Sequence, residues 1–352
     1  ARSILDGFMD DYCRYYTAEE YAVIKQSDKG NFNGSGLSFK ANSLTVYKVT
    51  LNSPAEVAGI QKGDVVKGLT TGGTYHALSS LAEFTELFEG IENDEEFGLT
   101  FERDSAEKEV TLVKTEYLAS YVSYVDDTHT YKFRTVDGVK VLTEITDDSD
   151  NPIGMAELPS DTALITYTGF SGNSFAELTQ VFDLMEEQGK TKLIFDLRSN
   201  GGGLIDELCH VASFFVDQRK VLLYADDSDN VRTHFSSDRN CKKEFIESLS
   251  ILADENTASA SECFINAIIY YGEREETPFT FGKNALIVQN ENIVSGKPAH
   301  TYGKGVMQET YELRNGGALK ITTAFVLSPD GETCVQKKNE SGNRGIEATE
   351  TN

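Results

Sequence analysis

The first third of the chain carries its apolar residues in short runs rich in β-branched and aromatic side chains. Such runs predict β-strands, and the clearest are Leu44–Val49, Asp64–Val66, Phe97–Phe101 and Glu109–Val113. Ser79–Phe88 has helical spacing instead. We therefore expect a small β-rich domain over residues 30–116.

From residue 117 onward, strand-like and helix-like patterns alternate, which is typical of an α/β core. The pattern predicts strands at Ala163–Thr168, Leu193–Leu197, Val221–Ala225, Leu249–Ala253 and Ile321–Leu327. It predicts helices at Ser174–Gln188, Leu204–Val216 and Ser259–Tyr271. The core domain is expected over residues 117–352.

Residues 1–29 form a separate N-terminal segment. Five apolar residues recur there at helical spacing, namely Ile4, Leu5, Phe8, Met9 and Tyr12. The spacing predicts a short amphipathic helix that packs against the body of the protein.

The amino-acid composition limits the classes of molecule that we expect the protein to bind. With 32 basic and 57 acidic residues, the formal net charge is −25, which repels nucleic acid and anionic lipid. The five cysteines have no CxxC pair or framework spacing, so we expect mostly free, buried thiols. No apolar run reaches the roughly 18 residues that a membrane helix needs.

A serine-rich turn is the first candidate for catalysis. Thr257–Glu262 lies between a predicted strand and a predicted helix, where amides of the first helical turn can stabilise an oxyanion. Ser259 is well placed there as a nucleophile. Taken alone, the same residues fit an ordinary helix cap.

Two further motifs become candidates for catalysis when they are considered together with this serine. In Tyr302–Gln308 a lysine stands between glycines, and Ser-Lys pairs are a known alternative to Ser-His-Asp. Asp196–Gly203 ends a strand in three glycines, whose amides can face a carbonyl oxygen. A phosphate cradle is the alternative, although the Gly-Lys-Ser/Thr ending of a P-loop is missing.

Along the chain the glycine motif comes first, the serine motif second and the lysine motif third, and in that order they resemble the S41 family of carboxy-terminal processing, or tail-specific, peptidases. The resemblance implies an α/β fold with a ClpP/crotonase-like peptidase core. By position, Ser259 would be the nucleophile of a serine peptidase and Lys304 its general base, with Gln308 orienting the lysine. The amides of Gly202 and Ala260 would form the oxyanion hole.

The β-rich domain resembles a PDZ domain inserted before that core. The resemblance rests on Asn33–Phe39, which is similar to a carboxylate-binding loop, and on Asn52–Asp64, which is similar to the Ser-Pro-Ala signature. It implies that backbone amides near Gly34, Gly36, Leu37 and Ser38 hold the C-terminal carboxylate of a peptide. Ser35 replaces an apolar residue of the usual loop.

The stretch between nucleophile and base is longer than usual in the family, by roughly one hairpin. It contains a second lysine, Lys283, which also follows an aromatic residue and a glycine. We favour Lys304, because only it has the following glycine and a glutamine four positions later. Gly201 replaces a proline that is often found in the family.

The expected partners are proteins or peptides with free C-termini, without nucleic acid, cofactor or metal. None of the five histidines offers a rival triad, and these are His76, His129, His210, His234 and His300. The resemblance implies an extracytoplasmic protein whose leader is absent from this chain, and a homo-oligomer is compatible with it. The alternatives are a non-catalytic PDZ scaffold and an acyl-transfer enzyme on a crotonase-like fold.

Overall fold

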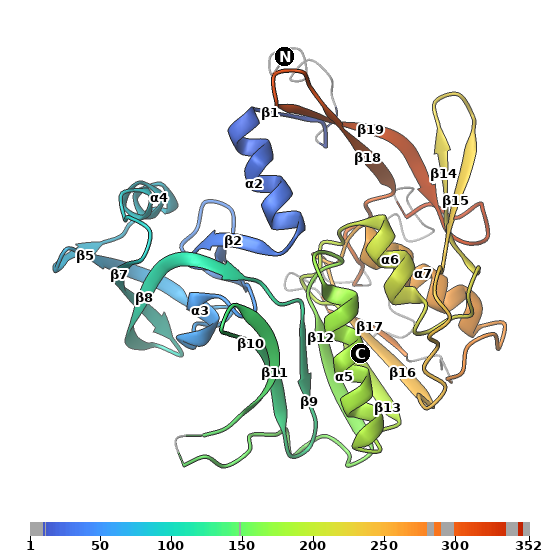
Figure 1. Ribbon diagram of the computed structural model, residues 1–352, viewed down its shortest axis with the longest axis horizontal. Helices are drawn as coiled ribbons and strands as arrows, with labels where there is room; N and C mark the ends of the chain where they lie inside the picture. Colours follow the sequence, from blue (N-terminus) through green and yellow to red (C-terminus); the bar gives the residue numbers. More distant parts are fainter. Residues whose placement is uncertain are drawn as a thin grey trace. The chain divides into compact units, whose positions relative to one another are not determined.

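The computed structural model describes residues 10, 12–147, 149–279, 285–289, 299–335 and 344–347 (Figure 1). The chain divides into two compact units. The core unit contains residues 1–25, 121–131 and 144–352, and the second unit contains residues 26–120 and 132–143. The predicted boundary at residues 116 and 117 thus lies close to the observed one at 120 and 121. Residues 132–143, expected in the core, cluster with the second unit.

A largely parallel sheet forms the centre of the core unit. Its strands run in the order β9 (Val122–Val125), β12 (Thr162–Tyr167), β13 (Lys192–Asp196), β16 (Ser248–Asp254) and β17 (Leu286–Gln289). All pairs are parallel except β9 with β12. Beyond β9, the sheet continues to β10 (Thr130–Val136) and β11 (Val139–Ile145), along which the chain passes into the second unit.

Helices follow three of the parallel strands and lie beside them in Figure 1: α5 (Ser174–Glu187), α6 (Ile205–Ala212) and α7 (Ala260–Gly272). Buried phenylalanines hold these layers together. The Phe215 ring lies 5.5 Å from Phe195 of β13 and 5.1 Å from Phe264 of α7, measured between centroids. Since each fully buried phenylalanine side chain contributes roughly 1.5–3 kcal/mol, this cluster stabilises the packing of α7 on the sheet.

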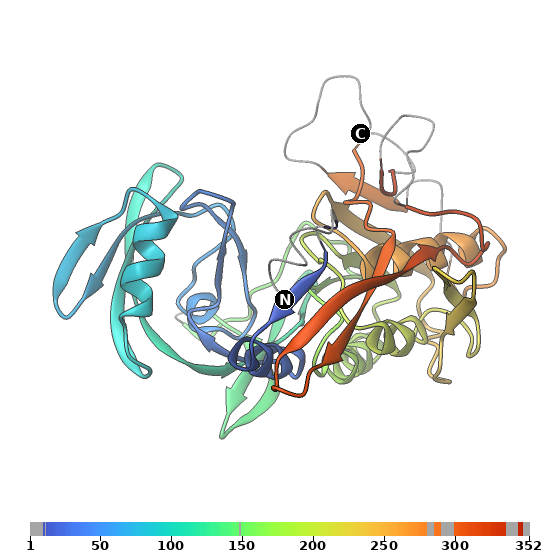
Figure 2. The ribbon, with the colours of Figure 1, turned by 90° about the horizontal axis from the view of Figure 1, so that it is seen from above.

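A second, antiparallel sheet completes the core unit. Its order is β1 (Arg14–Tyr16), β19 (Ala318–Leu327), β14 (Val221–Asp227) and β15 (Arg232–Ser236), and β18 (Val306–Glu312) also pairs with β19. Figure 2 shows β18 and β19 as long neighbouring strands.

Residues 14–16 of the N-terminal segment form the strand β1. These residues are extended because their backbone pairs with β19, with Arg14 opposite Lys320. A helix, α2 (Ala18–Asp28), follows, and Tyr12 lies outside it. The predicted helical residues 4, 5, 8 and 9 lie outside the described residues.

The second unit is β-rich, as predicted. A five-stranded antiparallel sheet has the order β2 (Asn31–Gly34), β8 (Ala106–Leu118), β7 (Glu95–Arg103), β5 (Val65–Thr71) and β6 (Thr74–Ala77). Beside it are the strand pair β3 (Leu37–Phe39) and β4 (Val46–Val49) and the helices α3 (Pro54–Val57) and α4 (Leu81–Glu89). Leu69, Phe84, Phe97 and Phe101 are buried in its core.

The elements predicted from apolar patterns are confirmed, mostly within a few residues at each end. Among the described strands, the pattern missed β1, β2, β3, β6, β9, β10, β11, β15, β17 and β18. In the part that the structure describes, no helix is long and apolar enough to cross a membrane. All five cysteines are free, and four of them are buried.

Candidate active site

The candidate site lies at the carboxyl ends of β13 and β16. These strands are parallel neighbours, so the segments that leave them, the glycine turn after Asp196 and the serine turn after Asp254, come together. Asn200, which is completely buried, joins the two turns. Its carbonyl oxygen accepts hydrogen bonds from Ala258 N (3.0 Å) and from the Ser261 hydroxyl (3.1 Å).

The glycine turn requires Gly202 for a physical reason. Its φ is +95°, and a Cβ there would lie 2.7 Å from Ala258 O and 2.7 Å from Ala260 N. No side chain fits, so the backbone of Gly202 lies directly against the serine turn. The Gly202 amide donates to Asn200 Oδ1 at 2.9 Å. The two amides predicted for the oxyanion hole, those of Gly202 and Ala260, are therefore close together. In this conformation the Gly202 amide is already hydrogen-bonded to Asn200.

Ser259 has the backbone of a strained turn. Its φ is 60° and its ψ is −120°, in a region that costs a non-glycine residue about 1–3 kcal/mol. It is half-buried and immediately precedes α7. A serine on a strained strand-to-helix turn is a known way to present a nucleophile. Ser261 is completely buried, and its hydroxyl donates to Asn200 as described.

Glu262 connects the serine turn to the lysine segment. This fully buried carboxylate accepts from Ser259 N (3.0 Å) and Lys304 N (2.9 Å) on Oε2. On Oε1 it accepts from Gly303 N (2.7 Å) and the Thr301 hydroxyl (2.5 Å). Burial raises the pKa of Glu262, and the four donors oppose that shift. Sequence reasoning gave this residue no role, although its position three residues after Ser259 is the signal of a capping box.

Lys304 lies in the loop before β18 and is half-buried. Its Nζ atom lies 5.1 Å from the centre of the Tyr12 ring. Burial lowers the pKa of Lys304, and the charge of Lys320 lowers it further. Three groups act in the opposite direction, namely Cys263, Glu262 and Asp10. The ammonium group is thus in surroundings that favour loss of its proton.

Gln308 lies on β18, four residues after the lysine. Its Nε2 donates to Thr322 Oγ1 of β19 at 3.2 Å. Among the described residues, no hydrogen bond joins Gln308 to Lys304. The competing lysine, Lys283, lies outside the described residues.

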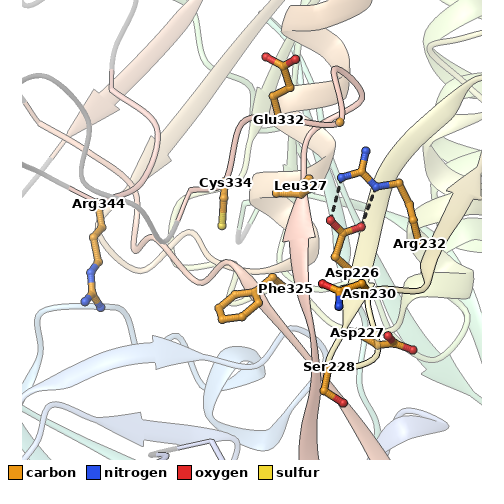
Figure 3. A pocket seen from close by; sticks show the side chains of 11 residues that line it. Asp226, Asp227, Ser228, Asn230, Arg232, Phe325, Leu327, Glu332, Cys334 and Arg344 are labelled. Atoms are coloured by element: carbon orange, nitrogen blue, oxygen red, sulfur yellow. Dashed lines mark hydrogen bonds and ion pairs between the residues drawn. The ribbon is translucent and has the colours of Figure 1, made fainter.

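A cavity of about 880 Å³ lies beside the lysine loop (Figure 3). Phe325, 60% exposed, and Leu327 form apolar parts of its wall, and the Asp226–Arg232 ion pair (2.7 Å) forms a polar part. Cys334, which also lines the cavity, lies next to the loop, with its Sγ 3.8 Å from the carbonyl oxygen of Gly305.

The second unit contains the predicted peptide-binding loop. Gly36 has a φ of +86°, and a Cβ there would lie 2.1 Å from Ser53 Cβ, so only glycine fits. Gly34 ends β2, while Leu37 and Ser38 begin β3, which pairs with β4. Among the described strands β4 is the only partner of β3, which leaves its other edge for an added strand.

No metal-binding cluster of three or more His, Cys, Asp or Glu side chains occurs among the described residues. His210 is paired instead with Glu207 (3.3 Å) and Asp238 (3.1 Å). His300 Nδ1 lies 2.7 Å from the carbonyl oxygen of Thr301.

Comparison with known proteins supports the predicted family. Residues 161–275 match the family model described as peptidase family S41. This segment includes the glycine turn, the serine turn and Glu262, but not Lys304. The predicted S41 resemblance is therefore confirmed.

Curated relatives match almost the whole chain. A "Probable CtpA-like serine protease" of Staphylococcus aureus (strain N315) is 28% identical over 337 residues, which cover 94% of this chain and 57% of the relative. The protein of the same name from Staphylococcus epidermidis (strain ATCC 12228 / FDA PCI 1200) is 26% identical over 338 residues, with the same coverage. The chain thus spans little more than half the length of these relatives.

A solved structure shares the fold. The photosystem II D1 C-terminal processing protease matches with a TM-score of 0.55 and 20% identity, over 99% of this chain and 79% of that protein. At this identity the match concerns the fold alone.

Proposed function

Because residues 161–275 match the model of peptidase family S41, we propose that the chain is a serine endopeptidase with a Ser259–Lys304 dyad. One observation carries the proposal. The buried Glu262 carboxylate binds the amides of both residues, at 3.0 and 2.9 Å, and so holds the nucleophile turn and the base loop as one unit. Such fixed positions are what an acyl-transfer mechanism requires of its nucleophile and base.

In the proposed mechanism, neutral Lys304 takes the hydroxyl proton of Ser259 as Oγ attacks the peptide carbonyl carbon. The tetrahedral intermediate collapses, the peptide C–N bond breaks, and the leaving amine takes the proton from the lysine ammonium. Lys304 then takes a proton from a water whose oxygen attacks the acyl carbon, and the lysine ammonium returns the proton to Ser259 Oγ as the ester bond breaks. Burial supports this role, because it lowers the pKa of Lys304 toward neutral pH.

The oxyanion would be held by amides at the start of α7 and in the glycine turn. Ala260 supplies a first-turn amide, which has no acceptor within its helix. For Gly202 to donate as well, its amide has to leave Asn200 Oδ1, and the absence of a Cβ makes that rotation inexpensive. Gln308 would accept from the Lys304 ammonium through its carbonyl oxygen, since its amide nitrogen is engaged by Thr322.

Substrate binding would involve both units. In the core unit, the cavity at Phe325 would receive a substrate side chain beside the lysine loop. In the second unit, a PDZ-type function would place a peptide along β3, with its C-terminal carboxylate at the amides of the Gly34–Ser38 loop. Substrates would then be proteins or peptides with free C-termini, outside the cytoplasm as the family resemblance implies.

Active-site labelling tests the nucleophile. A fluorophosphonate probe should label the wild type and Ser261→Ala but not Ser259→Ala, which should keep its fold and lose peptide hydrolysis. Ser261→Ala is the matched control, because its buried hydroxyl lies two residues away and is bonded to Asn200. Labelling lost only in Ser261→Ala would contradict the assignment.

The base is tested by the same assay. Lys304→Ala and Lys304→Arg should both fail to form acyl-enzyme, the latter because a guanidinium does not release its proton. Lys283→Ala should keep the wild-type pH profile. An inactive Lys283→Ala beside an active Lys304→Ala would move the base to the other lysine.

A further inference from the structure

The N-terminal segment reaches the proposed base from a distant part of the sequence. Strand β1 fastens it, since Arg14, Tyr15 and Tyr16 pair antiparallel with residues 318–320 of β19. The residues just before β1 are thereby held beside the lysine loop and β18. Neither the family motifs nor the mechanism above assigns them a role.

Tyr12 covers the lysine. Its ring centre lies 5.1 Å from Lys304 Nζ, and its hydroxyl donates to Tyr302 of the same loop. Burial and this hydrogen bond raise the pKa of Tyr12 to about 12, so the phenol stays neutral at the pH of catalysis. The ring thus occupies space that water would otherwise fill, without placing a negative charge on the ammonium group.

Asp10 supplies the charge that Tyr12 lacks. Its carboxylate accepts from Tyr12 N at 2.8 Å and from the Thr322 hydroxyl, which in turn accepts from Gln308. Although burial acts to raise the pKa of Asp10, these and further hydrogen bonds lower it overall, so the group is ionised. The carboxylate acts on Lys304 electrostatically.

We propose that Asp10 and Tyr12 form a positioning segment for the base, in which Tyr12 keeps water away from the Lys304 ammonium group and Asp10 supplies a fixed negative charge. The proposal rests on the proposed function, because the value of a tuned lysine lies in its work as a base. It goes further by adding a segment that lies some 290 residues earlier in the chain.

The two residues act on Lys304 in opposite directions. Loss of the Tyr12 ring admits water, which stabilises the ammonium form and raises the pKa of Lys304. Because burial is the largest influence on the pKa of Lys304, we expect this effect to exceed the ring's own attraction for the cation. Loss of the Asp10 charge removes an attraction for the ammonium and lowers that pKa. The other groups that act on Lys304 stay in place, and these are Glu262, Cys263 and Lys320, as do the groups that act on Tyr12, which are Tyr302 and Arg344.

Competitive acetylation of lysines, read by mass spectrometry across a pH series, measures the Lys304 midpoint without reference to activity. The exposed Lys108 serves as internal reference in the same sample. In the full chain, Tyr12→Ala should move the Lys304 midpoint to higher pH, and Asp10→Asn should move it to lower pH. Tyr12→Phe keeps the ring and should stay near the wild type.

Catalysis should follow these shifts. Each unit by which the midpoint rises lowers the neutral fraction of Lys304 at pH 7 about tenfold, and the acylation rate of Tyr12→Ala should fall with it. Asp10→Asn keeps the size of its side chain and provides the test even if Tyr12→Ala unfolds.

Three results would overturn the proposal. The first is an unchanged Lys304 midpoint in both Tyr12→Ala and Asp10→Asn, and the second is a shift of the same sign in both variants. The third is a rise in the activity of Tyr12→Ala without a shift of the midpoint, which would mean that Tyr12 inhibits the enzyme by covering Lys304. If instead the midpoints shift as expected while Lys304→Ala still forms acyl-enzyme, Asp10 and Tyr12 do set the pKa of Lys304, but Lys304 is not the base.

Discussion

At the scale of single residues, Glu262 is the residue whose importance the structure raises most. Each of its two oxygens accepts two donors, and three of the four donors are backbone amides. A carboxylate suits this arrangement, because an ionised Asp or Glu accepts on both oxygens and donates on neither.

Glu262→Gln should therefore be destabilising although it is nearly isosteric. Its amide nitrogen would face two donors, and each buried donor left unpaired costs about 1–3 kcal/mol. We expect a loss of about 2–4 kcal/mol in the free energy of unfolding, measured by urea denaturation, together with a loss of acyl-enzyme formation.

Glu273→Gln, at the exposed C-terminal end of the same helix, is the matched control and should change little. A fully stable and active Glu262→Gln would show that Glu262 does not hold the dyad.

At the scale of elements, the site depends on two turns that touch because β13 and β16 are adjacent parallel strands. Their closest approach is at Gly202, whose missing side chain lets the two backbones meet. The consequence is that catalysis should be sensitive to a single methyl group at this position.

Gly202→Ala should be both unstable and inactive. Two causes contribute, since a positive φ costs an alanine roughly 1–2 kcal/mol and the added Cβ would lie 2.7 Å from Ala258 O and Ala260 N. Gly189→Ala separates the backbone cost from the cost of the close contacts. Gly189 also has a positive φ, +68°, but an added Cβ there would have no atom within 4 Å.

We expect Gly189→Ala to lose only the backbone contribution and to stay active, with both proteins compared by urea denaturation and fluorophosphonate labelling. Equal losses in the two variants would mean that the turns do not need this close approach.

At the scale of the whole molecule, a net charge of −25 works against the binding of anionic peptide tails. Recognition of a C-terminal carboxylate would have to come from local amides in the Gly34–Ser38 loop, which is part of a different unit from the dyad. Substrate choice and chemistry would then be divided between the units.

Peptides that end in a free apolar carboxylate should be cleaved with a higher kcat/KM than the same peptides amidated at the C-terminus. The physical reason is that an amide end lacks the charge that backbone N–H groups bind best. Progress curves for each pair, with the Ser259→Ala protein as background, measure the effect. Equal kcat/KM for both forms would remove the second unit from substrate selection.

The helices and strands of the core were predictable from sequence because their apolar patterns report local backbone preference. Leu193–Leu197 and Ser174–Gln188 were found within a residue or two as β13 and α5. The same reasoning did not find the strand at residues 14–16, because its partner β19 lies about 300 residues away in the chain.

By itself, the sequence determined the order of the elements, the S41 resemblance and the candidate residues Ser259, Lys304 and Gln308. Only the tertiary structure decided which distant groups surround them. Glu262 meets Lys304 across 42 positions, and Tyr12 meets it across nearly the whole chain. The burial and hydrogen bonding of these groups depend on packing between segments that are distant in the sequence. A local sequence pattern does not predict such packing.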